Sequence, residues 1–215
     1  MAFRLPNGST FDLASTYGSP ITVSGISNAN PAVVSATAHG LSNGDIIELT
    51  SGWTGLNGRL FRVSGALTDS FELEDINTTD TTRFPAAGGA GSAREITAFV
   101  SVTQVTDVTT SGGEQQFFQF GFLEENDDRQ LPTTRSPMSM NIVVADDSTQ
   151  PFVAVAEAAD QSRNPTGLRL NLPNNDIILY NGYTTISETP ALARNNLMTR
   201  TMTFSLSGRP TRYNA

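Results

Sequence analysis

Residues 138–207 read MSMNIVVADDSTQPFVAVAEAADQSRNPTGLRLNLPNNDIILYNGYTTISETPALARNNLMTRTMTFSLS, and this stretch decides the fold. Apolar side chains occupy every second position from Met138 to Val144, which is the period of a half-buried β-strand. A helical pattern follows, and then three further strand patterns separated by turn residues. The stretch therefore predicts a β-sheet with one helix packed against it.

The helix is predicted to cover about residues 150–161. Pro151 suits a first helical turn, because the N–H that proline lacks would be unpaired there, and Ser148 or Thr149 can cap the turn. Asn164–Pro165 ends the pattern. One apolar stripe with helical spacing faces the sheet, formed by Phe152, Val155, Ala156 and Ala159.

The final strand of this stretch, residues 198–207, is predicted to have two unlike faces. One face carries Met198, Arg200, Met202, Phe204 and Leu206. The other face carries five small hydroxyl side chains, Thr199, Thr201, Thr203, Ser205 and Ser207. Two explanations remain open, a solvated sheet face rich in β-forming residues or a face that meets something polar or water-filled.

Composition excludes several classes of protein. The 215 residues contain no cysteine and one histidine, which excludes disulfides and thiolate metal sites and most catalytic triads. We therefore expect no enzyme, no metal and no cofactor, and interpret the acid pairs Asp127–Asp128 and Asp146–Asp147 as solvated turns. No apolar run is long enough for a membrane helix, and MAFRLPNGSTF lacks the apolar core of a signal peptide, so we expect synthesis in a cytoplasm.

The net charge is −8, and all 13 basic residues are arginine. A GC-rich genome is one explanation for the absence of lysine. The planar guanidinium group suits pairing with carboxylates at interfaces. An acidic chain without lysine is a poor candidate for binding phosphates, so we expect DNA to contact it without binding.

The sequence pattern of residues 19–86 predicts a small all-β, barrel-like module. Five short strand patterns lie between glycine, asparagine and serine turns, at Ile21–Val23, Ala32–Thr37, Ile46–Thr50, Arg59–Val63 and Ser70–Leu73. We interpret His39 as a turn or packing residue and Trp53 as a core residue. Residues 77–92 have the composition of a linker with little to bury.

Between this module and Met138, the chain has two strand patterns and a long acidic segment. Residues 95–105 alternate as a strand, and QQFFQFGF at 115–122 places three phenylalanines on one face, which predicts that this strand supplies much of the core. Residues 123–137 are predicted to form a loop without regular structure, of a length that is usually functional or disordered. The loop carries Glu124, Glu125, Asp127, Asp128, Arg129 and Arg135.

The order of these elements resembles the major tail tube protein of long-tailed bacteriophages. The resemblance covers roughly Arg94 to Tyr213: a strand, the STQPFVAVAEAADQS helix, the GLRLNLPNNDIILYNGY hairpin, ETP, and the long MTRTMTFSLSGRPTRY strand. It implies a β-sandwich flanked by one helix, whose copies form hexameric rings stacked into a hollow tube that conducts DNA. It also implies a virion location, in the tail, and tape measure and tail terminator or tip proteins as partners. No specific DNA binding and no membrane are expected.

A second resemblance concerns HGLSNGD, LNGRLFRV and DSFEL, which are similar to a small β module inserted in phage proteins and related to a half-domain of ubiquitin-activating enzymes. With no cysteine, no thioester chemistry carries over. We accordingly predict a discontinuous tail tube domain, residues 1–18 and 87–215, with residues 19–86 inserted on the tube exterior. The acidic loop is the candidate contact between stacked rings, and the hydroxyl residues from Thr199 to Ser207 are the candidate inner face.

An alternative hypothesis is a phage adhesion or decoration protein whose β module binds a carbohydrate or a cell surface. The helix and the long hydroxyl-faced strand favour the tube hypothesis, because a protein that only adheres to a surface needs neither.

Overall fold

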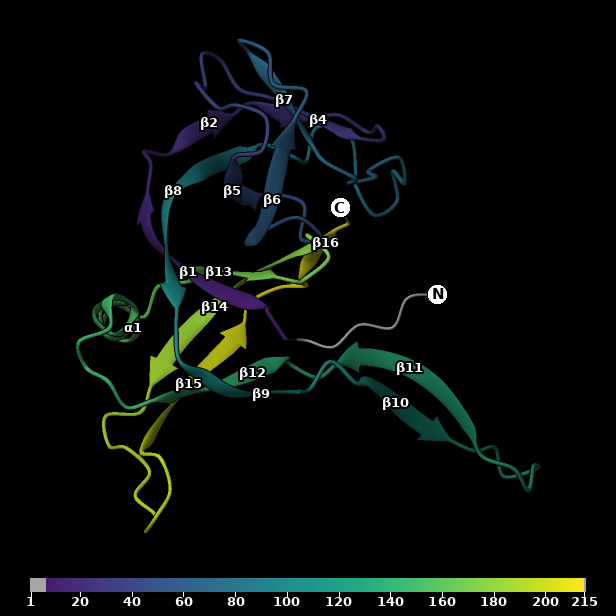
Figure 1. The fold of residues 1–215 in the computed structure, drawn as a ribbon. Coiled ribbons are helices and arrows are strands. Elements are labelled where there is room, and N and C mark those ends of the chain that lie inside the picture. Colours follow the sequence, from purple (N-terminus) through teal and green to yellow (C-terminus); the bar gives the residue numbers. More distant parts are fainter. Residues whose placement is uncertain (1–6, 215) are drawn as a thin grey trace.

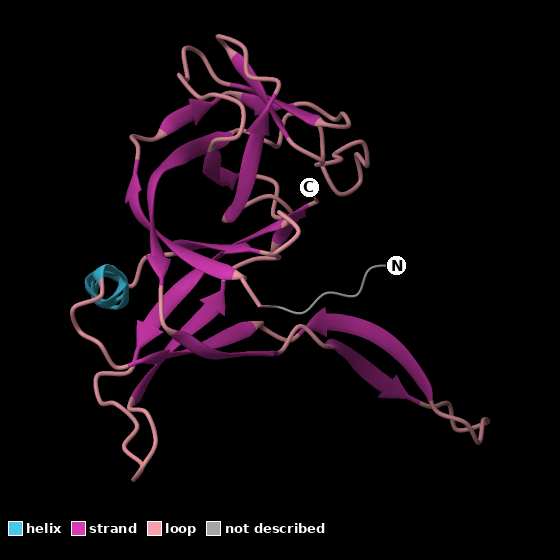
Figure 2. Cartoon of the chain, viewed as in Figure 1, coloured by secondary structure: helices cyan, strands magenta, loops and turns pink. Residues whose placement is uncertain are grey.

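The computed structural model describes residues 7–214, so residues 1–6 of the predicted first segment lie outside the described residues (Figure 1). The chain is mainly β with one α-helix in this range, in an arrangement consistent with a β-sandwich (Figure 2). The predicted fold class is therefore confirmed. The helix is α1, Pro151–Ser162.

The strands follow one another along the chain with the bounds β1 Thr10–Tyr17, β2 Ile21–Val23, β3 Gly25–Ile26, β4 Ala32–Ser35, β5 Ile46–Ser51, β6 Arg59–Ser64, β7 Ser70–Leu73, β8 Gly91–Val102, β9 Val105–Ser111, β10 Gln115–Phe120, β11 Arg129–Arg135, β12 Ser139–Ala145, β13 Thr166–Asn171, β14 Ile177–Ile186, β15 Thr199–Leu206 and β16 Thr211–Tyr213. Each of the five strands predicted in the module is present, to within two residues at its ends.

One long, bent sheet runs through most of the described chain. Its main path is β3-β4-β7-β6-β5-β8-β1-β13-β14-β15-β12-β9, with β2 paired to β8 and β16 paired to β14. Strand β8 joins the two halves, because its first residues pair with β2 and β5 and its last residues pair with β1. In Figure 1 it descends from the module at the top into the lower part of the molecule. We call this lower part, namely β1, β9, α1 and β12–β16 with the end of β8, the body.

The body has its own core beneath α1. Alternate residues of β12 and β15 point into it and are fully or almost fully buried, including Met140, Ile142, Val144, Met202 and Phe204. The helix contributes Phe152, Val153 and Ala156 to the same cluster. The predicted apolar stripe is thus confirmed for Phe152, Ala156 and Ala159, while Val155 is only partly buried.

The helix begins differently from the prediction. Its N-cap residue is Gln150, which makes no side-chain capping bond, so the expected cap by Ser148 or Thr149 is wrong. Asp147 instead organises the turn before the helix by accepting hydrogen bonds from the backbone N–H and the hydroxyl of Thr149, at 3.0 and 2.6 Å. The Gln150 side chain donates to the other Asp147 oxygen at 2.7 Å.

The module has a second core, and the predicted linker is part of it. Trp53 is 2% exposed and donates its indole N–H to the Pro85 carbonyl, as expected of a core residue. His39 is buried, with its two ring nitrogens hydrogen-bonded to the backbone of Leu41 and Ser70. Phe84 packs edge to face on Trp53 and is buried, so the prediction that residues 77–92 have little to bury is wrong.

A third cluster joins the module to the body. Ile46 and Leu60 of the module pack with Ala14, Ile96, Leu179 and Tyr213. Beside this cluster Glu48 is buried and accepts hydrogen bonds from Arg94 and from the Asn181 amide. The division into domains at residues 19–86 stays a prediction, and these contacts show that the module is packed against the body.

A buried carboxylate ties three strands of the body together. Asp12 on β1 accepts hydrogen bonds from Ser101 at 2.6 Å, from Arg169 at 2.8 and 3.1 Å, and from Asn171 at 2.7 Å. Burial raises the pKa of Asp12, but these hydrogen bonds outweigh it and hold the pKa below the ordinary value of 3.8. The charged form is therefore the one that the fold stabilises.

We expect Asp12→Asn to lower the free energy of unfolding by about 1.5–3 kcal/mol at pH 7, because hydrogen bonds to the charged group are lost. Since the pKa of folded Asp12 is depressed, its contribution is complete above the unfolded pKa and declines as the pH falls below it. The difference between the two proteins should accordingly shrink below about pH 4. Urea denaturation at several pH values measures this, with the exposed Asp107→Asn as a control that should change stability by less than about 0.5 kcal/mol.

Candidate assembly surfaces

The first candidate surface is an arm that projects from the body. Strands β10 and β11 pair only with each other, and together they continue the hairpin that β9 and β12 form in the main sheet (Figure 1). The bend falls at Gly112 and Gly113, whose φ angles are +82° and +81°. A side chain at Gly112 would bring its Cβ to 1.8 Å from the Pro137 carbonyl oxygen, so only glycine allows this bend.

The arm corrects the prediction that residues 115–122 supply the core. Phe118, Phe120 and Phe122 do share one face of the segment, with Phe118 and Phe120 stacked at 6.3 Å and Phe120 and Phe122 edge to face at 5.6 Å. Phe118 is nevertheless 60% exposed, and the neighbouring Phe117 on the other face is 54% exposed. No second layer covers either face of the arm in the described chain. The sequence does contain a signal of this exposure. Phe117 and Phe118 are adjacent and so lie on opposite faces of the strand, whereas a strand with one buried face does not need aromatic side chains on both faces.

The acidic segment forms the tip and one strand of the arm. Residues 129–135 are strand β11, so the predicted loop without regular structure is wrong for half of its length. Glu124, Glu125, Asp127 and Asp128 lie in the turn between the strands, and all four are exposed. Arg129 forms an ion pair with Glu125, and Arg135 lies at the other end of β11, at the base of the arm.

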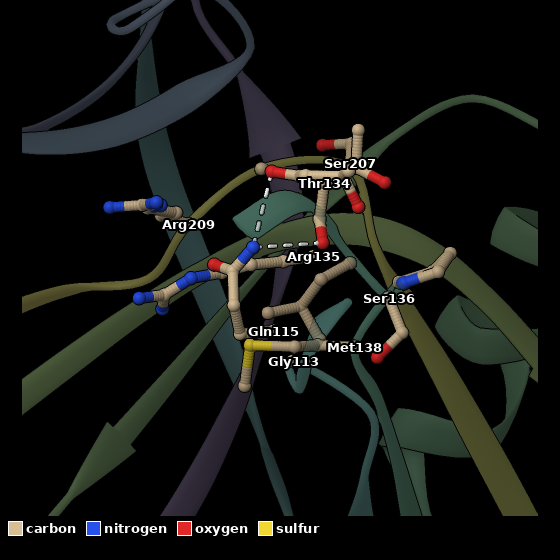
Figure 3. A pocket seen from close by; sticks show the side chains of 12 residues that line it. Gly113, Gln115, Thr134, Arg135, Ser136, Met138, Ser207 and Arg209 are labelled. Carbon is tan, nitrogen blue, oxygen red and sulfur yellow. Dashed lines mark hydrogen bonds between the residues drawn. The ribbon is translucent and has the colours of Figure 1, made fainter. Parts of the chain in front are cut away.

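A groove of about 460 Å³ lies at the base of the arm, between β11 and the segment after β15 (Figure 3). Gln115 of β10 lines the groove and donates to the carbonyls of Thr133 and Thr134 of β11, at 3.1 and 3.3 Å. Arg135 lines the groove from the arm and Arg209 from the body, and Figure 3 shows both guanidinium groups extending to the same side. The groove is therefore a place where the arm and the body present positive charge together.

The second candidate surface lies on the sheet face opposite the body core. Thr199, Thr201, Thr203 and Ser205 alternate with the buried residues of β15, so the predicted separation of faces is confirmed. Ser207 lies just beyond the strand, where its hydroxyl donates to the Asn181 carbonyl at 2.9 Å. The other predicted face is confirmed for Arg200, Met202 and Phe204, which are buried, whereas Leu206 is only partly buried and Met198 lies outside β15 and is 48% exposed. Arg200 donates to the Ser187 carbonyl and pairs with Glu157 of α1 at 3.2 Å.

Strand register extends this polar face across four strands. Residues directly opposite one another share a face, so β9, β12 and β14 each add side chains beside those of β15. We call the result the hydroxyl face, which consists of Asp107, Thr109, Ser111, Ser139, Asn141, Val143, Ala145, Tyr183, Thr185, Thr199, Thr201, Thr203 and Ser205. Asp107 is the one charged member of this set, and the set contains no arginine.

Neither surface has the features of a catalytic or metal centre. Within residues 7–214, no group of three or more histidine, cysteine, aspartate or glutamate side chains is placed to hold a metal ion. No helix in the described range is long and apolar enough to cross a membrane. The two surfaces instead offer an exposed apolar arm and a broad polar sheet, which are features of contact with other molecules.

Comparison with known proteins identifies the family. The family model described as phage tail tube protein matches residues 51–215, which is more than half of the chain. The chain belongs to the phage tail tube protein family. A search of curated proteins found no match. As a member of this family the chain is a structural protein of the virion tail, and the family implies self-assembly into a tube, which favours the tube hypothesis over the adhesion hypothesis.

Because no layer covers the arm, we expect its aromatic residues to contribute little to the free energy of unfolding. Phe118→Ala should change the free energy of unfolding of the unassembled tail tube protein by less than about 0.5 kcal/mol, because the side chain is already exposed to water. Phe204→Ala should lower it by about 3–5 kcal/mol, because Phe204 is fully buried in the body core. Denaturant titration of the two variants checks this, and equal losses would show that the arm is packed in solution.

Proposed function

We propose that this tail tube protein forms hexameric rings that stack into a hollow tube, and that DNA passes through the tube into the host. The observation that carries the proposal is the hydroxyl face. A four-stranded sheet whose exposed face is mostly polar and whose opposite face seals a core can line a water-filled channel. Six copies arranged around an axis would place the edges of these sheets next to one another.

The charge of the hydroxyl face suits a lumen that DNA slides through. Each arginine that neutralised a phosphate would add a salt-dependent attachment, and this face carries none. Asp107, repeated around a ring, would repel phosphates within the Debye length of about 8 Å at physiological salt. We therefore propose that Thr199, Thr201, Thr203 and Ser205 face a water-filled channel, which is the second of the two explanations for these residues. Ser207 is left out, since it lies beyond the end of β15.

The arm is proposed to make contacts between copies, most of them between stacked rings. It exposes apolar side chains that a single chain leaves uncovered, namely Phe117, Phe118, Phe122, Leu123 and Leu131. Covering them on a neighbouring copy would bury this surface, and the charged tip would set the register of the contact. Glu124, Glu125, Asp127, Asp128, Arg129 and Arg135 are thus retained as candidate contact residues.

Residues 19–86 are proposed to lie on the outside of the tube. In Figure 1 the module sits at the end of the molecule away from the strands of the hydroxyl face. The similarity of this module to a half-domain of ubiquitin-activating enzymes stays a prediction. The proposed partners, besides other copies of the chain, are the tape measure protein and the tail terminator or tip proteins, with assembly in the host cytoplasm.

Purified chain, concentrated alone or with its tail partners, should form hollow tubes in negative-stain micrographs. The absence of cysteine allows single-site labelling in the same experiment. Ser205→Cys on the hydroxyl face should react with a long polyethylene glycol maleimide in free subunits and lose this reactivity in tubes, because the reagent cannot reach the lumen wall.

Leu67→Cys is the matched control, since Leu67 is 69% exposed in a loop of the module. It should react equally in free subunits and in tubes. Tubes in which Ser205→Cys stays fully reactive would contradict the placement of the hydroxyl face, and chains that remain monomeric at every concentration would contradict the proposed function.

Replacing residues 115–135 with a short glycine–serine turn should leave a folded chain that no longer forms tubes. The arm pairs only with itself, so its removal takes no strand out of the main sheet. Circular dichroism and urea denaturation check the fold, and sedimentation velocity checks assembly. Normal tubes from this variant would show that the arm makes no essential contact.

A further inference from the structure

The ion pairs of the described chain leave one group of positive charges uncompensated. Six arginines of residues 7–214 pair with carboxylates, namely Arg62, Arg94, Arg129, Arg169, Arg200 and Arg212. Four of the arginines without such a partner gather in one region, which we call the arginine face: Arg59, Arg83, Arg135 and Arg209. In a chain of net charge −8, such a grouping is a positive surface that carboxylates of another molecule can complement.

Arg59 is at the centre of this face. Its guanidinium group donates to the carbonyls of Gly55 and Arg209 and to the Thr211 hydroxyl, so each of these hydrogen bonds goes to a neutral acceptor. Burial lowers the pKa of the Arg59 guanidinium, and the nearby charges of Arg83 and Arg209 lower it further. Arg209 also lines the groove at the base of the arm together with Arg135, which joins the four residues into one positive surface.

The complementary charge is at the tip of the arm. Glu124, Asp127 and Asp128 are exposed, and none of the three forms an ion pair or a side-chain hydrogen bond within the described residues. We call these three residues the acidic tip. Glu125 is excluded from it because it is paired with Arg129.

The acidic tip of a chain is held away from its own arginine face. Arg135 lies at the base of the arm, and the other six residues of β11 separate it from the tip. At about 3.3 Å per residue, a strand of this length keeps the two about 20 Å apart. The arm also points away from the body (Figure 1), so the charges can meet only between different chains.

We propose that the acidic tip of one copy binds the arginine face of the next copy. This inference rests on the proposed tube function and names the surface that receives the arm. The contact joins two different patches, so it is head to tail and can continue from copy to copy without closing on itself. Carboxylates meeting guanidinium forks would fix the register of successive copies and disfavour other contacts.

Charge reversal tests the pairing in the full-length chain. Glu124→Arg, Asp127→Arg and Asp128→Arg together reverse the tip, and Arg135→Glu with Arg209→Glu reverses the face while leaving the partly buried Arg59 in place. Each set alone should raise the protein concentration needed for tube formation by about 100-fold or more, because like charges then face each other. Arg163→Glu with Arg194→Glu, two unpaired arginines elsewhere, is the matched control and should assemble as the unaltered chain does.

An equimolar mixture of tip-reversed and face-reversed chains should form tubes again. The positive tips fit the negative faces, and the negative tips fit the positive faces. Recovery in the mixture is a result that neither misfolding nor a general charge effect can produce. Circular dichroism confirms that each variant is folded. If a reversal impairs folding, Glu124→Gln, Asp127→Asn and Asp128→Asn replace it, and their tubes should lose the dependence on salt that the unaltered chain shows.

Three results would overturn the inference. Tip-reversed chains that form tubes at the normal concentration would show that the tip has no anionic role. A mixture that stays unassembled, with both variants folded, would show that tip and face do not meet. Binding of a duplex DNA probe that face reversal abolishes, with tip reversal leaving assembly intact, would assign the arginine face to nucleic acid. Failure of the unaltered chain to form tubes would instead count against the proposed function.

Discussion

The burial of alternate residues of β12 and β15 beneath α1 is the constraint on which the rest of the structure depends. Because side chains alternate along a strand, placing Met140, Ile142, Met202 and Phe204 in the core sends their neighbours to the opposite face. That face then carries mainly hydroxyl and amide groups across β9, β12, β14 and β15. A one-residue change of register would exchange the two faces, so the core and the polar surface specify each other.

One hairpin forms part of this sheet and also extends beyond it. Strands β9 and β12 lie in the main sheet, whereas β10 and β11 continue beyond the bend at Gly112 and Gly113 as an arm without a covering layer. This hairpin thus contributes both to the hydroxyl face and to the projecting arm. Since the arm is continuous with the polar sheet, its docking on a neighbour would orient that sheet in the assembly. This continuity is the physical link between the proposed lumen and the proposed contacts.

The module is packed closely against the body. Tyr213 near the C-terminus is buried against Leu60, and its hydroxyl accepts a hydrogen bond from the backbone N–H of Arg62. Strand β8 belongs to the sheets of both parts. The module would therefore move with the body as one unit, and the arginine face, which includes Arg59 of the module and Arg209 of the body, would keep a constant shape.

The sequence by itself determined the elements whose signal is local. Alternation gave the faces of β12 and β15, helical spacing placed α1, and turn residues separated the five strands of the module. Tertiary structure decided which apolar faces are covered. The phenylalanines of the arm have the period of a core strand, yet no layer lies opposite them, while Phe84 in a segment of linker composition is buried against Trp53. The hydroxyl residues and the acidic segment could be predicted as candidates, but the arginine face could not. Its members are separated by up to 150 residues, and only the packing of the module on the body brings Arg59 and Arg209 together.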